Sequence, residues 1–134
     1  MAKRPTELIV TLPHPRIGCR PNSRQHWAAK ARCVAADRRD AGIAALDAIS
    51  RSPLLLLPFR SPVVRIRWLV RDRRGLRADS DNQLAACKAF FDGLTDAGVW
   101  WDDRAVRFLP VETAIDPDPR LELRIMEAGT DDAG

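Results

Sequence analysis

Residues 63–71 read Val-Val-Arg-Ile-Arg-Trp-Leu-Val-Arg, and this alternation of apolar and basic residues is typical of a β-strand. Successive side chains of a strand point to opposite faces of the sheet. The apolar face would consist of Val64, Ile66, Trp68 and Val70. The other face would carry Arg65 and Arg67, with Arg71 just beyond them. The chain must therefore cover the apolar face with other elements while these arginines stay accessible.

Two helices are predicted as partners of that strand. Over residues 82–97 the apolar side chains recur at three- and four-residue steps, and Gly98 suits the end of such a helix. A longer helix is expected over about 24–49, capped by Asn22 or Ser23. The buried face of this longer helix would consist of Trp27, Ala31, Val34, Ala45 and Ile49.

Further strands are predicted over residues 7–13, 107–115 and 120–126. Together these elements predict an α+β fold, a small mixed or antiparallel sheet packed with two main helices. At 134 residues, the chain is expected to form one domain over 1–134. Its ordered core would span roughly 8–126.

The composition excludes several classes of protein. The densest apolar run, Pro-Leu-Leu-Leu-Leu-Pro-Phe, is too short to span a bilayer. The tail over 128–134 is acidic and is expected to be frayed. The first ten residues lack the apolar stretch of a signal peptide, so a cytoplasmic protein without a membrane partner is expected. Three widely spaced cysteines without a CxxC pair exclude a disulfide framework and disfavour structural zinc.

Charge is distributed unevenly along the chain. Residues 1–82 contain 17 Lys/Arg against 7 Asp/Glu, a net charge of +10, whereas residues 83–134 contain 5 against 11, a net charge of −6. A basic half is the usual mark of a polyanion partner, although a solvated arginine-rich surface is the alternative. The candidate phosphate-binding residues are Arg65, Arg67, Arg71, Arg73, Arg74 and Arg77.

Several carboxylates lie near the two ends of the helix predicted over residues 82–97. Asp79 and Asp81 lie where that helix begins, and Asp102 and Asp103 follow it on the return segment. If the helix is continuous, its 100° rotation per residue places Lys88 and Asp92 on the same face as Asp81. Carboxylates this close repel each other unless a cation lies between them.

Magnesium suits this set of side chains, because Mg²⁺ prefers oxygen ligands from carboxylates, water and substrate phosphates. Mn²⁺ is an alternative ion. Purely structural roles are equally compatible with the spacing alone. Asp81 would then cap the helix, Asp79 would pair with Arg77, and Lys88 would form an ordinary i,i+4 pair with Asp92.

The order of these motifs resembles the RusA family of Holliday-junction resolvases. The residues that carry the resemblance are Asp-Ser-Asp-Asn at 79–82, then a lysine, then Phe-Phe-Asp-Gly-Leu-Thr-Asp-Ala-Gly-Val-Trp-Trp-Asp-Asp at 90–103. A looser match at 21–39 extends the resemblance, so that it covers roughly residues 8–126.

The resemblance implies catalytic and supporting residues. Metal-binding aspartates fall on Asp79, Asp81 and Asp103, and the catalytic lysine falls on Lys88. Supporting positions are Asn82, Asp92 and Asp102. In the family pattern the lysine follows the second aspartate by four residues, whereas here it follows by seven, about one helical turn further along.

The sequence is thus interpreted as a homodimeric, magnesium-dependent endonuclease that resolves four-way DNA junctions by paired symmetric cleavage. Two cuts in one encounter require two chains, because one chain carries a single set of these acids. The apolar run at 53–59 and the pair Trp100 and Trp101 offer material for a dimer interface, although either stretch could equally belong to the core. Two alternatives remain open, a non-catalytic DNA-binding module and a nuclease for other branched DNA.

Overall fold

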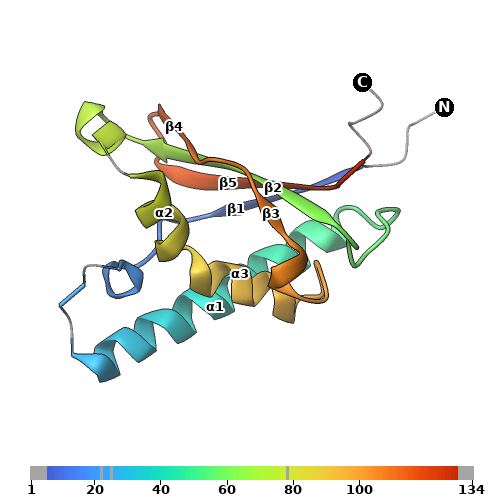
Figure 1. Ribbon diagram of the computed structural model, residues 1–134, viewed down its shortest axis with the longest axis horizontal. Coiled ribbons are helices and arrows are strands. Elements are labelled where there is room, and N and C mark those ends of the chain that lie inside the picture. Colours follow the sequence, from blue (N-terminus) through green and yellow to red (C-terminus); the bar gives the residue numbers. More distant parts are fainter. Residues whose placement is uncertain (1–5, 22, 25, 78, 130–134) are drawn as a thin grey trace.

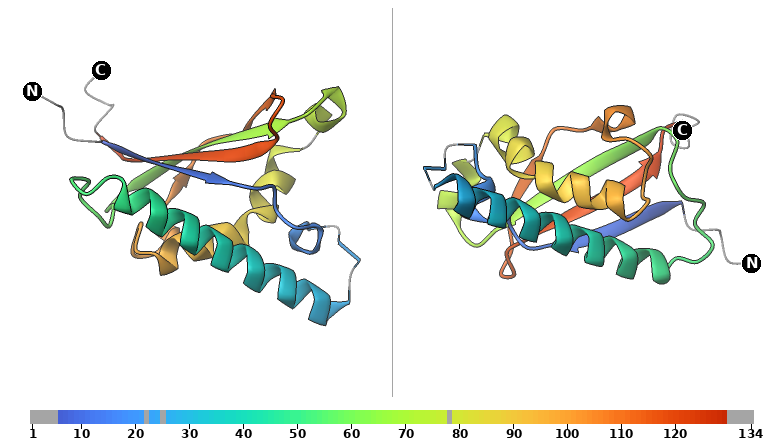
Figure 2. Two further views of the ribbon diagram at one scale, coloured as in Figure 1. Left: turned by 180° about the vertical axis from the view of Figure 1, so that it is seen from behind. Right: turned by 90° about the horizontal axis from the view of Figure 1, so that it is seen from below.

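A five-stranded mixed sheet is covered on one face by two helices that run across it side by side (Figures 1 and 2). The computed structural model describes residues 6–21, 23–24, 26–77 and 79–129. The helices and strands in chain order are β1 Glu7–Leu12, η1 Ile17–Cys19, α1 Trp27–Ser50, β2 Pro62–Val70, η2 Arg73–Arg77, α2 Ser80–Ala86, α3 Lys88–Asp96, η3 Asp103–Ala105, β3 Arg107–Phe108, β4 Glu112–Ile115 and β5 Arg120–Glu127. The elements labelled η are short 3₁₀ helices. The predicted α+β class is confirmed.

Strand β2 is the centre of the sheet. It pairs antiparallel with β5, which in turn pairs antiparallel with β1. On its other side β2 pairs in parallel with β3 and then with β4. The single strand expected over 107–115 is therefore wrong: residues 109–111, which include Pro110, separate two short strands. Proline cannot donate a hydrogen bond to a neighbouring strand.

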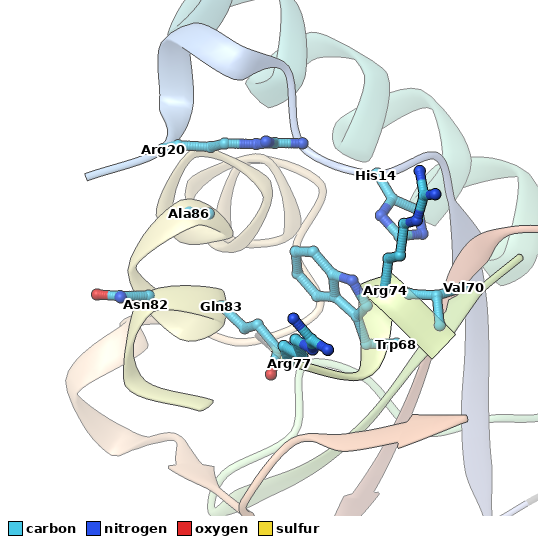
Figure 3. Close-up of a pocket in the computed structure, with 10 residues that line it drawn as sticks. His14, Arg20, Trp68, Val70, Arg74, Arg77, Asn82, Gln83 and Ala86 are labelled. Carbon is cyan, nitrogen blue, oxygen red and sulfur yellow. The ribbon is translucent and has the colours of Figure 1, made fainter. Parts of the chain in front are cut away.

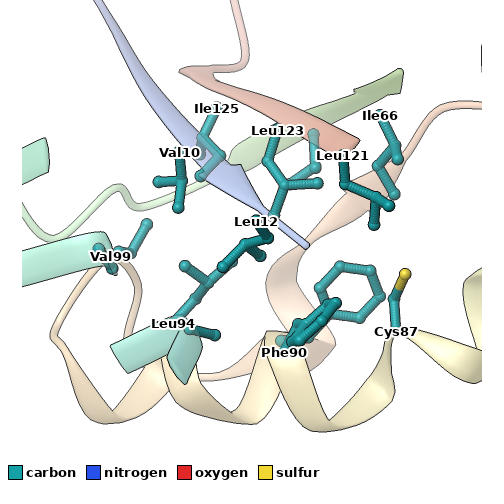
Figure 4. Close-up of a cluster of buried hydrophobic side chains, with 14 of the residues drawn as sticks. Val10, Leu12, Ile66, Cys87, Phe90, Leu94, Val99, Leu121, Leu123 and Ile125 are labelled. Carbon is teal, nitrogen blue, oxygen red and sulfur yellow. The ribbon is translucent and has the colours of Figure 1, made fainter. Parts of the chain in front are cut away.

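The alternation in β2 is confirmed. Val64, Ile66, Trp68 and Val70 pack into the core beneath the helices, and Val64 and Ile66 are fully buried there. Leu69, on the opposite face by alternation, is also buried, at the end of the strand. Side chains from β1 and β5 complete this core with Phe90 and Leu94 of α3 (Figure 4). Arg65 and Arg67 lie on the opposite, uncovered face of the sheet, as the alternation predicts.

Helix α1 differs from its prediction in where it begins and in which face it buries. It begins after His26, whose Nδ1 accepts a hydrogen bond from the backbone N–H of Ala28 at 3.2 Å. The expected cap at Asn22 lies outside the described residues, and Ser23 precedes the helix by several residues.

The first turns of α1 slope away from the sheet (Figures 1 and 2). Trp27 is consequently 75% exposed and Val34 41% exposed, so both were wrongly expected to be buried, as was Ala31. The buried residues of α1 are Asp37, Ala41 and Ala45, of which only Ala45 was predicted, while Ile49 is partly buried.

Helices α1 and α3 pack closely at Gly93. A Cβ atom at this position would overlap the backbone carbonyl oxygen of Arg38 and lie 2.9 Å from the Cβ of Ala41. On the rim of the same contact, Arg38 donates two hydrogen bonds to the carboxylate of Asp96, at 2.6 and 2.8 Å. The absence of a side chain at Gly93 thus permits the close approach that holds α3 against α1.

The helix expected over 82–97 is broken at Cys87, so the prediction of one continuous helix is wrong. Cys87 has φ −89° and ψ 0°, and its N–H donates to the carbonyl of Leu84, three residues earlier, at 3.1 Å. Figure 1 shows α2 and α3 meeting at an angle. The helical projection that placed Asp81 on one face with Lys88 therefore does not apply. Gly98 closes α3 with φ +84°, as expected.

Within the described residues, none of the helices has the length and apolar character needed to cross a membrane.

Candidate active site

The first turn of α2 presents two neighbouring carboxylates. Asp79, in extended conformation, caps the helix: its Oδ1 accepts a hydrogen bond from the backbone N–H of Asp81 at 2.8 Å. The cap is thus Asp79 and not Asp81, contrary to the structural alternative drawn from the sequence. Both acidic residues are exposed, and in the part of the chain that the structure describes neither forms an ion pair. The alternative pairing of Asp79 with Arg77 is also not seen there.

Two side chains of α2 tie this turn to the segment that follows η3. The hydroxyl of Ser80 accepts a hydrogen bond from the backbone N–H of Val111 at 3.1 Å. One turn further on, the buried amide of Gln83 donates to the hydroxyl of Thr113 at 3.1 Å. The start of α2 is thereby held against the segment that leads into β4.

Lys88, the first residue of α3, lies close to carboxylates of both α3 and η3. Its amino group lies 3.9 Å from the Asp92 carboxylate and 3.9 Å from the Asp103 carboxylate. Its side chain is 72% exposed, so the amino group is accessible to a large ligand. The expected pair with Asp92 is therefore present, but Lys88 also faces the second acid of the return segment.

Asp102 and Asp103 are adjacent in sequence but have different partners. Asp102 caps η3 and accepts two hydrogen bonds from the Arg104 guanidinium, at 2.8 and 3.0 Å. The Arg104 guanidinium, followed by the Arg104 backbone N–H, lowers the pKa of Asp102 to about 2. Arg104 therefore engages Asp102, while Asp103 remains facing Lys88.

The six candidate phosphate-binding arginines do not form one patch. Arg65 and Arg67 lie on the uncovered face of the sheet, and each has an acidic neighbour: Arg65 is 3.9 Å from Glu112, and Arg67 stands opposite Glu122. The other four, Arg71, Arg73, Arg74 and Arg77, are exposed in and before η2, directly ahead of Asp79.

The donor chemistry of these acids fits a hard cation. Among the described residues, no three acidic, histidine or cysteine side chains come close enough to form a ready-made metal site. The two neighbouring exposed carboxylates of α2 nonetheless suit Mg²⁺, which commonly uses one or two protein carboxylates and fills its remaining positions with water and substrate phosphate.

Two of the thiols, the buried Cys87 and the partly buried Cys19, are poor candidates for nucleophiles. Burial raises the pKa of Cys87 to about 12, and burial together with a hydrogen bond to Asp37 raises the pKa of Cys19 to about 12. Thiols with such pKa values stay protonated at neutral pH. The available chemistry is therefore that of carboxylates and an amine.

Sequence reasoning missed the residues that position the site. Arg104 follows Asp102 by two residues, a spacing that signals a local side-chain turn and could have indicated which acid is engaged. No sequence pattern connects Ser80 with Val111, or Gln83 with Thr113, because these pairs are about thirty residues apart and meet only through the sheet.

No family model matches the chain. Crossover junction endodeoxyribonuclease RusA of Escherichia coli (strain K12) is 39% identical to it over 85 residues, which cover 62% of this chain and 67% of the relative. The relatives of the same name from Shigella sonnei (strain Ss046) and Enterobacteria phage 82 show the same identity and coverage. This similarity, together with the α+β fold, shows that the chain belongs to the RusA family.

Proposed function

We propose that this protein is a magnesium-dependent endonuclease that resolves four-way DNA junctions. Membership of the RusA family supports the substrate class, since the relatives are named crossover junction endodeoxyribonucleases. The observation that carries the proposal is the position of Lys88, 3.9 Å from Asp103, on a helix that directly follows the one headed by Asp79 and Asp81.

The proposed roles follow from charge and exposure. Asp79 and Asp81 would hold the metal ion, and Asp103, which does not form one cluster with them in the described structure, would complete the site when metal and DNA bind. The bound ion would polarise the scissile phosphodiester and activate a water molecule. Lys88 would stabilise negative charge on the phosphate in the transition state. Asp92 would position the Lys88 amino group from within α3, and Asn82 would support the first turn of α2.

The lysine spacing is compatible with this assignment because α2 and α3 are separate helices. The three additional residues between the second aspartate and the lysine are taken up by α2 and the break at Cys87. Lys88 therefore begins a new helix, and its position is set by the contact of α3 with α1 rather than by the axis of α2.

Arginines before α2 would bind DNA phosphates without reading the base sequence. Among the six candidates, we favour Arg71, Arg73, Arg74 and Arg77, because no carboxylate within 4 Å neutralises them in the described part of the chain. Arg65 and Arg67 would contribute less, since Glu112 and Glu122 accompany them.

We further propose that one domain comprising the whole chain acts as a two-fold dimer in the cytoplasm. Paired symmetric cuts need two active sites, and a two-fold dimer would match the approximate symmetry of the junction. Exposed apolar side chains supply interface material: Trp101 is 80% exposed, and Leu54 and Leu56 are 65% and 72% exposed. Trp100 is buried in the core and would not take part.

The adjacent acids offer a matched test. We expect Asp103→Asn to abolish cleavage of a synthetic four-way junction in Mg²⁺, while Asp102→Asn, which loses a carboxylate already engaged by Arg104, retains most of it. Chelation with EDTA should stop cleavage by the unchanged protein. Equal loss in both variants would contradict the assignment of Asp103.

The same assay separates the alternatives. A folded protein that binds junctions yet cuts none in Mg²⁺ or Mn²⁺ would be a non-catalytic DNA-binding module. Faster cleavage of flaps or forks than of four-way junctions would indicate a nuclease for other branched DNA.

A further inference from the structure

A cavity of about 520 Å³ lies between the end of β2, η2, α2 and the loop after β1 (Figure 3). This volume is within the range typical of small-molecule sites. Neither Asp79 nor Asp81 lines the cavity, so it is separate from the acidic site on the same helix.

The rim of the cavity is strongly basic. Arg20, Arg74 and Arg77 line it, and no aspartate or glutamate does. In the described part of the chain none of these three guanidinium groups lies within ion-pair distance of a carboxylate. Three uncompensated guanidinium groups around one hollow favour an anion, and their planar donor geometry matches phosphate oxygens.

The inner wall is apolar and rigid. Trp68, Val70 and Ala86 form it, each at most 8% exposed. The Trp68 ring is held edge-on by His14, with ring centroids 4.9 Å apart, and His14 itself donates to the carbonyl of Leu69 at 2.7 Å. A bare inorganic ion would leave this apolar surface unused, whereas a planar base or a sugar would cover it.

One buried polar group faces the same space. Gln83 is only 3% exposed and lines the cavity, and its amide nitrogen donates to Thr113. That bond orients the amide, and within the described residues its carbonyl oxygen accepts no hydrogen bond. This oxygen is therefore available to an N–H donor of a base.

We propose that this cavity receives a single unpaired nucleotide of a DNA strand, with Arg74 and Arg77 on its phosphate and Gln83 on its base. The inference rests on the proposed function, because such a nucleotide would belong to the strand that approaches the acids of α2. A second hollow of about 380 Å³ shares Arg20 and Asn82 with this cavity, and so provides a continuing path for the strand. Enzymes that modify a base hold the extruded nucleotide in a pocket lined by apolar side chains and hydrogen-bonding groups, and this cavity offers the same combination of groups.

The test uses the full chain in EDTA without junction DNA, so that it does not depend on cleavage. Deoxycytidine monophosphate is titrated while NMR follows the indole N–H of Trp68, assigned with Trp68→Phe, and the side-chain amide of Gln83. We expect saturable shifts at both groups and none at the exposed indole of Trp101. Inorganic phosphate at the same concentrations should bind at least about tenfold more weakly, because it lacks the base contacts.

Arginines inside and outside the cavity lining supply the matched control. Arg74→Gln should weaken nucleotide binding about tenfold or more, the loss expected for a charged hydrogen bond. Arg39→Gln removes the same charge from α1, outside the cavity lining, and should weaken binding less than about threefold. Arg77→Gln provides a second variant at an exposed position.

Three results would overturn the inference: no saturable shift at Trp68, equal affinity for phosphate and nucleotide, or equal effects of Arg39→Gln and Arg74→Gln. If junction cleavage in Mg²⁺ is intact in any of these cases, the inference fails alone and the proposed function stands. If nucleotide binding is observed but cleavage is absent, the proposed function fails and the cavity remains a nucleotide site.

Discussion

At the scale of single residues, the proposed catalytic role of Lys88 can be tested separately from its contribution to protein stability. We expect Lys88→Ala to lower the single-turnover rate of junction cleavage about 100-fold or more while changing junction affinity little, because the amino group would act mainly on the transition state. Its pair with Asp92 is exposed, so stability should change by only a few tenths of a kcal/mol.

The control for this variant is Lys30→Ala, the other lysine among the described residues, which lies on α1. This control should cleave at nearly the unchanged rate. A Lys88→Ala protein that cleaves as fast as Lys30→Ala would show that Lys88 is not the catalytic lysine of the family.

Arg104 determines the titration of Asp102. The Arg104 guanidinium, followed by the Arg104 backbone N–H, which Arg104→Gln would keep, lowers the pKa of Asp102 to about 2 from its ordinary value of 3.8. Because the folded-state pKa is depressed, the interaction stabilises the fold above about pH 4 and loses this effect as the pH falls toward 2. NMR titration of the Asp102 carboxyl should show a midpoint near 2 that rises toward 3.8 in Arg104→Gln. An unchanged midpoint in Arg104→Gln would show that another group causes the shift.

At the scale of elements, the contact between α1 and α3 depends on one glycine. Gly93→Ala would place its methyl group against the backbone of α1, and we expect the free energy of unfolding to fall by about 1–3 kcal/mol. Urea denaturation measures this change. Because Lys88 lies on α3, displacement of this helix should also slow cleavage.

Gly42, on the facing helix, is the natural comparison. A Cβ atom there would lie 3.6 Å from the carbonyl oxygen of Gly93, an ordinary contact. Gly42→Ala should therefore be neutral or stabilise the protein by up to about 1 kcal/mol through helix propensity. Equal losses in the free energy of unfolding for the two variants would show that the packing of α1 against α3 does not depend on the missing side chain at Gly93.

The elements also show what the sequence could and could not predict. The alternation in β2 and β5 gave their buried faces correctly, because a strand with one covered face imposes a period of two on its own side chains. Periodicity did not predict the buried face of α1 correctly. The first turns of this helix extend beyond the sheet (Figure 2), so the sheet does not cover their apolar side chains. Periodicity also failed at Cys87, where apolar spacing continues across a break in the backbone.

The same distinction holds for the candidate site. The cluster of acids was evident from spacing, and local turn geometry distinguishes Asp102 from Asp103. The cavity between β2, η2 and α2 was not predicted, because its lining comes from four segments that are brought together only by the fold.

At the scale of the whole molecule, the proposed dimer is open to direct measurement. Light scattering on the purified protein should give twice the 15.0 kDa mass of one chain, and the same two chains should be bound in a complex with one junction. Trp101→Ser should weaken the association if this exposed side chain lies in the interface, whereas Trp27→Ser, an equally exposed tryptophan on α1, serves as the control. A monomer that makes paired cuts would contradict the symmetry argument.

The strand order has a consequence for how the molecule is synthesised. Among the described strands, β1 pairs only with β5, which is made roughly a hundred residues later. At a translation rate of roughly 5–20 residues per second, β1 would wait about 5–20 s for its hydrogen-bonding partner. During that time α1 can shield its apolar side chains, but the edge of β1 stays open. The hydrogen bonds that join β1 to the sheet can therefore form only after β5 has been synthesised, and until then the edge of β1 is able to pair with other chains.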